Sequence, residues 1–193
     1  MSRLPELVKV VTVLLVTVTV AAVSGSMWQA DSVGNTSSAS DIAITRSGTP
    51  VPDVAAIECR LTGDLNAMQK DHILPLATML GNWVAHLGQR IPLDETQVAL
   101  RHATAAEHVI AKDASAVQSL RSAANPGLVA DIKKALDSYA AGLSTLAPVL
   151  QDHRRVFQFS AIATAAERMS TGNAALGDAN KALDLIVPAG ICP

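Results

Sequence analysis

From Asp53 to the end of the chain, apolar residues recur at intervals of three and four positions rather than two. This interval places them on one face of an α-helix, whereas a half-buried strand would need strict alternation. Prolines and the Asn-Pro-Gly triplet at 125–127 interrupt the pattern and divide it into four segments. The sequence therefore predicts an all-α domain with four helices.

The first predicted helix begins at Asp53, which can cap its N-terminus. It ends at Ile91-Pro92, because the residue before a proline avoids helical dihedral angles. Pro75 must kink or divide this helix, since proline removes a backbone hydrogen bond and crowds the preceding turn. The predicted buried stripe is Val54, Ile57, Leu61, Leu65, Met68, His72, Leu76, Leu80, Trp83 and Leu87.

Three further helices follow along the chain. The second begins at Asp94, the third follows the triplet at 125–127, and the fourth covers residues 162–187. The second helix has a thin stripe that contains two alanines: Val98, His102, Ala105, Val109, Ala116 and Leu120. Asn173 and Asn180 fall on the stripe of the fourth helix, where we expect their amides to hydrogen-bond inside the domain.

Four helices with short connections and one apolar face each favour an up-down-up-down four-helix bundle. Hydrophobic residues make up 49% of the chain but aromatic residues only 3%, so leucine, valine and alanine must supply most of the core. We therefore expect a closely packed bundle over residues 53–193. An N-terminal hydrophobic helix and a flexible linker precede it.

An apolar run covers residues 10–23 and follows two basic residues. Two interpretations remain open. Residues 1–28 are long enough to span about 30 Å of hydrocarbon as an uncleaved transmembrane signal-anchor. Alternatively, they form a signal peptide that is cleaved near Ser24. In both cases the basic flank stays in the cytoplasm and the rest of the chain is exported, either membrane-anchored or secreted.

Residues 29–52 are rich in serine, threonine, glycine, asparagine and aspartate, and two prolines lie at their end. Such a segment buries little apolar surface, so we expect a flexible linker between the membrane and the bundle.

The chain has two cysteines, Cys59 near the start of the first helix and Cys192 just after the fourth. In an up-down-up-down bundle these two helix ends lie at the same end of the molecule. An even number of cysteines outside the cytoplasm favours pairing. We therefore predict a Cys59–Cys192 disulfide.

Five histidines are the candidate metal ligands. Glu-x-x-His is absent, so a ferritin-like di-iron site is not expected. A hairpin centred on Pro92 would place His72 about 15 Å from the level of His102, so we interpret His72 as an isolated core residue. Three histidines fall toward the bundle end opposite the cysteines and form a candidate ligand cluster, although a solvated bundle end would look the same: His86, His102 and His153.

The remaining motifs argue against several function classes. The net charge is −2 and the chain has no basic block, so nucleic-acid binding is not expected. The sequence also lacks a Gly-x-Ser-x-Gly elbow, a glycine-rich phosphate loop and a His-Glu-x-x-His motif. We therefore predict neither an enzymatic activity nor a cofactor.

The composition resembles that of small exported helical proteins of bacterial cell envelopes. Our leading hypothesis is a non-enzymatic, membrane-anchored helical domain of the envelope that binds a protein or a small ligand outside the cytoplasm. The alternative is an exported ligand carrier or a metal- or haem-binding bundle. A carrier needs an internal cavity, a metal site needs converging histidines, and a protein-binding module needs an exposed apolar patch.

Overall fold

The computed structural model describes residues 54–85, 92–120, 122–123, 125–151 and 159–186. Its elements are α2 (Val54–Met68), the π-helical turn η1 (Gln69–Ile73), α3 (Leu74–Ala85), α4 (Leu93–Ser119), α5 (Pro126–Gln151) and α6 (Phe159–Ile186). Because α2, η1 and α3 follow one another without a break, they make one long first helix. The described residues therefore form four long helices and no strand.

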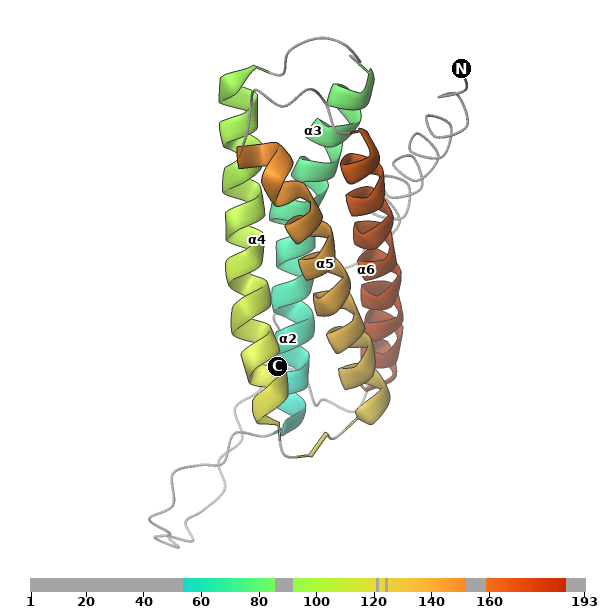
Figure 1. Ribbon diagram of the computed structural model, residues 1–193. Helices are drawn as coiled ribbons and strands as arrows, with labels where there is room; N and C mark the ends of the chain where they lie inside the picture. The colour runs from blue at the N-terminus through green and yellow to red at the C-terminus, as the bar shows by residue number, and fades with distance from the viewer. Residues whose placement is uncertain (1–53, 86–91, 121, 124, 152–158, 187–193) are drawn as a thin grey trace, which may run out of the picture.

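Successive helices run in opposite directions, so the predicted up-down-up-down bundle is confirmed (Figure 1). In this view α4 lies on the left, α6 on the right, and α5 crosses in front of the first helix. The most extensive packing is between α5 and α6. The start of α2 and the end of α6 lie at the lower end of the bundle, together with the connection from α4 to α5.

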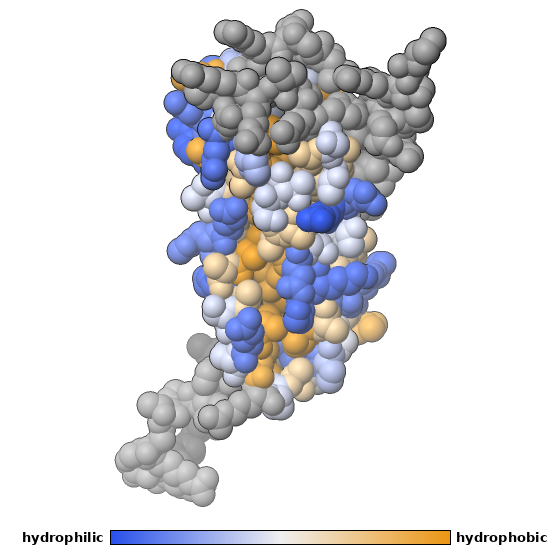
Figure 2. Space-filling view, viewed as in Figure 1, coloured by the Kyte–Doolittle hydropathy of each residue, from blue (hydrophilic) through white to orange (hydrophobic). Residues whose placement is uncertain are grey.

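The core is a continuous cluster of buried aliphatic side chains from all four helices. Each fully buried leucine or isoleucine contributes about 1.5–3 kcal/mol relative to an exposed one. Hydrophilic residues cover much of the surface in Figure 2, and an apolar strip follows the lower part of the seam between α4 and α5. The largest fully buried aliphatic side chains are Leu61, Leu65, Met68, Ile73, Leu76, Leu80, Leu128, Ile132, Leu136, Leu143 and Leu146.

Pro75 divides the first helix, as predicted, and the division takes the form of a π-turn. The Leu74 N–H donates to the carbonyl of Gln69, five residues earlier, in the turn directly before the proline. The buried positions accordingly step by five residues, from Met68 to Ile73. His72 lies one position before the buried Ile73 and is only half-buried, so its predicted place in the core is wrong.

The buried face of α4 also differs from the predicted stripe. The half-buried Val98, His102 and Val109 lie beside the face that packs into the core. Two neighbouring faces of this helix are similarly rich in alanine, so spacing alone could not separate them. The face that is buried in the structure includes two polar residues, which made it hard to recognise from the sequence. It consists of Thr96, Ala99, Ala103, Ala106, Ile110 and Asp113.

The inward amides of α6 hydrogen-bond inside the bundle, as the sequence predicts. Asn173 accepts two hydrogen bonds at Oδ1, one from the Tyr139 hydroxyl at 2.7 Å and one from the Gln69 amide at 2.8 Å. Asn180 exchanges two amide hydrogen bonds with Asn66, at 2.8 and 3.0 Å. These pairs tie α6 to α5 and to the first helix, and they satisfy polar groups that would otherwise be costly to bury.

At the lower end, the buried Glu58 receives the Asn125 N–H at 3.2 Å, and the Asn125 side chain caps α5 by accepting the Leu128 N–H at 3.1 Å. Cys59 follows Glu58 in the second turn of α2. The described residues contain no free cysteine. Cys192 lies outside them, so the Cys59–Cys192 disulfide stays a prediction.

The predicted anchor and linker, residues 1–28 and 29–52, lie outside the described residues. Among the helices that the structure does describe, none combines the length and apolar character needed to cross a bilayer.

Candidate functional site

Two histidines from different helices meet where η1 faces α4. The Nδ1 atoms of His72 and His102 are 3.5 Å apart, and the ring centroids are 5.7 Å apart with the planes inclined by 50°. Both side chains are half-buried, so they lie in the seam between the two helices and remain within reach of solvent. We call these two residues the histidine pair.

The prediction that His72 stands apart from the other histidines is therefore wrong, because the register of the first hairpin differs from the one expected. Trp83 donates to Glu95 at 2.7 Å, and Lys112 binds Asp64 at 2.8 Å. Together with the histidine pair, these contacts centre the hairpin on residues 87–89 rather than on Pro92. When the centre of the hairpin moves by one residue, the α4 residue that lies opposite a given residue of the first helix changes by two positions.

The predicted ligand cluster of His86, His102 and His153 stays a prediction, since His86 and His153 lie outside the described residues. His102 does have a histidine neighbour, but it is His72. No group of three or more histidine, cysteine, aspartate or glutamate side chains that could hold a metal ion occurs within the described ranges.

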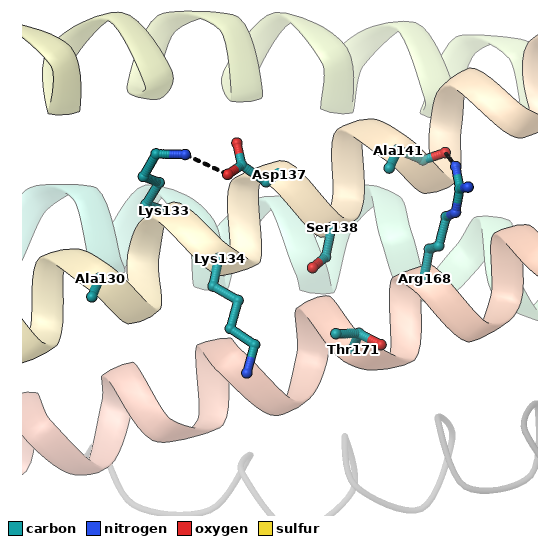
Figure 3. Close-up of a pocket in the computed structure, with 8 residues that line it drawn as sticks. All are labelled: Ala130, Lys133, Lys134, Asp137, Ser138, Ala141, Arg168 and Thr171. Atoms are coloured by element: carbon teal, nitrogen blue, oxygen red, sulfur yellow. Dashed lines mark hydrogen bonds and ion pairs between the residues drawn. The ribbon is translucent and has the colours of Figure 1, made fainter.

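A shallow groove lies on the outer surface between α5 and α6, and Figure 3 shows its lining side chains. We call it the cationic groove, because three of its lining residues are basic and one is acidic. It is lined by Ala130, Lys133, Lys134, Asp137, Ser138, Ala141, Arg168 and Thr171.

The basic residues of the groove on α5 differ in their partners. Lys133 forms an ion pair with Asp137 one turn later, and both side chains are exposed. Lys134 forms no ion pair within the part of the chain that the structure describes. In Figure 3 its side chain extends toward α6, and the hydroxyls of Ser138 and Thr171 lie along the same groove.

The third basic residue, Arg168, reaches across from α6 to α5. Its Nη1 donates to the Ala141 carbonyl at 2.9 Å and to Thr145 Oγ1 at 3.0 Å. No described carboxylate pairs with this guanidinium. Arg168 and Lys134 therefore give the groove two positive charges that the described residues do not neutralise.

A second titratable cluster lies near the lower end of α4. Asp113 is fully buried, and neither of its carboxylate oxygens has a hydrogen-bond partner among the described residues. Arg60 stands 3.9 Å away but lies closer to Asp64, at 3.1 Å. Burial and the nearby charge of Asp64 raise the pKa of Asp113 to about 6, and Lys112 and Arg60 offset only part of this effect. Because the Asp113 side chain is closed off from solvent, we treat it as a feature of stability.

Sequence reasoning missed the cationic groove. Lys134 and Ser138 are four residues apart on α5, and Arg168 and Thr171 are three apart on α6, so each pair shares a helix face. The sequence therefore shows a polar, basic face on each of the two helices. Which two faces adjoin follows only from how α5 packs on α6.

No protein-family model, curated protein or solved structure matches this chain, so its function is inferred from the chemistry and geometry of its own residues.

Proposed function

We propose that this chain is a non-enzymatic helical module of the cell envelope that binds an acidic group of a protein or small ligand in the cationic groove, outside the cytoplasm. The N-terminal apolar segment anchors it in the membrane, or directs its secretion and is then removed. The Cys59–Cys192 disulfide fastens the lower end of the bundle in this oxidising location.

The observation that carries this proposal is the pair of unneutralised cations, Lys134 and Arg168, on either side of the groove. A carboxylate or phosphate bound in the groove would receive charge-assisted hydrogen bonds from Lys134 or from Arg168, and such bonds are shorter and stronger than neutral ones. Ser138 and Thr171 add hydroxyl groups that can donate to the same anion. Arg168 is already oriented by its two contacts to α5, so less side-chain freedom is lost on binding.

Apolar groups are also exposed on other parts of the surface. The exposed large apolar side chains among the described residues are Leu93 and Leu100 of α4 and Leu185 at the end of α6, and the apolar strip in Figure 2 follows the seam between α4 and α5. Between α5 and α6, a Cβ atom on Gly142 would lie only 3.2 Å from the Ala165 carbonyl oxygen, so the helices leave no room for a guest there. The carrier alternative therefore gains no support from this interface, while the metal-binding alternative has the histidine pair.

The test uses the full-length chain in its host, with a photoreactive amino acid in place of Ser138. We expect a cross-linked product that the substitution Lys134→Glu reduces several-fold, because charge reversal repels an acidic partner. Added polyglutamate should compete for the groove, whereas polylysine should not.

Two controls make this result specific. Lys181→Glu reverses an exposed charge elsewhere on α6, where Lys181 pairs with Asp178, and it should leave cross-linking unchanged. A photoreactive residue at the exposed Ser115 of α4 should give no polyglutamate-sensitive product. The proposal fails if Lys134→Glu and Lys181→Glu behave alike, or if the product at position 138 ignores polyglutamate.

A further inference from the structure

The histidine pair is spaced like two ligands of one metal ion. Imidazole nitrogens bind Zn²⁺ at about 2.0–2.1 Å, so two of them at the tetrahedral angle lie about 3.3–3.4 Å apart. The two Nδ1 atoms are 3.5 Å apart before any adjustment. We propose that His72 and His102 together bind a divalent transition-metal ion, of which Zn²⁺, Ni²⁺ and Cu²⁺ suit imidazole nitrogen best.

The surroundings of the pair agree with an ion that arrives from solvent. Both rings are half-buried in the seam, so an ion can reach the two Nδ1 atoms from solvent. Hard cations such as Mg²⁺ and Ca²⁺ prefer oxygen ligands and are not expected here.

Water completes the coordination in this proposal, because no third histidine, cysteine, aspartate or glutamate joins the pair within the described residues. Closed structural zinc sites use four protein ligands and hold the metal tightly. A site with two protein ligands and water releases its metal far more readily. The pair is thus suited to an exchangeable ion rather than to a permanent one.

The position of the pair gives metal binding a mechanical consequence. His72 belongs to the π-turn η1 and His102 to α4, so one ion links the interrupted part of the first helix to its neighbour. The two residues are 30 positions apart in the chain and converge only when it folds, so the metal binds the native state and stabilises it. The pair lies on a different seam from the cationic groove, and this proposal does not rest on the one made for that groove.

The test is a titration of the full-length chain, purified in detergent without a histidine tag and under non-reducing conditions. Calorimetry with Zn²⁺ should give one ion per chain, and saturating Zn²⁺ should raise Tm by roughly 3–8 °C while Mg²⁺ leaves it unchanged. His72→Gln and His102→Gln should each weaken binding at least tenfold and remove most of the shift in Tm. The matched control, His108→Gln, changes an exposed histidine of the same α4 and should bind Zn²⁺ like the native chain.

Electron paramagnetic resonance of bound Cu²⁺ gives a readout on the native chain alone, which matters if a glutamine variant fails to fold. The spectrum should show two imidazole nitrogen donors. Absence of binding, a single nitrogen donor, or unchanged affinity in His72→Gln would overturn the proposal. Loss of binding in His86→Gln or His153→Gln with retention in His72→Gln would also overturn it, and would place the metal in the histidine cluster predicted from the sequence.

Discussion

Gly172 of α6 lies directly against the ring of Tyr139 in α5. A Cβ atom on Gly172 would come within 2.8 Å of the ring carbon Cε1 and 2.9 Å of Cδ1. The ring has little freedom to move aside, because Tyr139 is fully buried and its hydroxyl is bound to Asn173. The glycine is thus what allows α5 and α6 to approach so closely at this level.

Gly172→Ala should destabilise the bundle by about 1–3 kcal/mol through overpacking, even though alanine is the better helix former by up to about 1 kcal/mol. Urea unfolding followed by circular dichroism measures the difference. The matched control is Gly177→Ala on the same helix, where an added Cβ meets nothing within 4 Å. That substitution should stabilise by about 0.5–1 kcal/mol, and equal stability of the two variants would show that the ring does not restrict position 172.

The single tyrosine of the chain should titrate at unusually high pH. Burial raises the pKa of Tyr139 above its ordinary value of 10.0. Because the folded pKa lies above the unfolded one, stability is unaffected below about pH 10 and falls as the pH rises beyond it. Tyrosinate absorbance should therefore appear together with loss of helical circular dichroism, and ionisation in a chain that stays fully helical would contradict the burial.

Asp113→Asn should stabilise the protein at neutral pH. The pKa of Asp113 is about 6 in the folded chain and 3.8 in the reference state, so the folded chain binds the proton more tightly. Stability consequently declines as the pH rises from about 4 to 6, and the penalty at pH 7.5 is at most about 3 kcal/mol. The asparagine variant should gain about 1–3 kcal/mol at pH 7.5 and little at pH 4.

The control for this prediction is Asp137→Asn, which removes an exposed carboxylate paired with Lys133. It should change stability by less than about 1 kcal/mol at either pH. If both variants respond to pH in the same way, the buried carboxyl of Asp113 is not the cause.

The intact mass of the exported product tests both the predicted disulfide and the fate of residues 1–28. A disulfide lowers the mass by two hydrogens and leaves no thiol for an alkylating reagent under denaturing conditions. Removal of about 24 residues would identify a signal peptide, whereas the full mass identifies the anchor. Cys59→Ser should destabilise by up to about 4–5 kcal/mol if the bond closes a loop of roughly 130 residues, so two reactive thiols would refute the pairing.

The fold could be predicted because the signals that define it are local. The Asn125-Pro126-Gly127 triplet starts α5, which Asn125 caps, and α4 has already ended at Ser119. Aliphatic side chains at helical spacing then leave few ways to bury four faces at once. Asn173 could be assigned an internal hydrogen bond for the same reason, since an amide on an apolar stripe needs a partner.

The candidate sites depend on the register between neighbouring helices and on the contacts between them. The spacing of apolar residues within one helix encodes neither. A hairpin centre misplaced by a few residues was enough to separate His72 from His102. The burial of Asp113 could not be expected either, because a carboxylate on a helix normally indicates the solvent face. Lys134 and Arg168 are ordinary surface residues until α5 and α6 are placed side by side.

The π-turn makes the first helix tolerant of a one-residue deletion. A step of five residues separates the buried Met68 and Ile73, one more than the step of four that an uninterrupted α-helix keeps on one face. The exposed Lys70 and Asp71 lie within that step, so neither contributes to the core. Deletion of either residue should therefore restore a step of four and join the two halves of the first helix in phase.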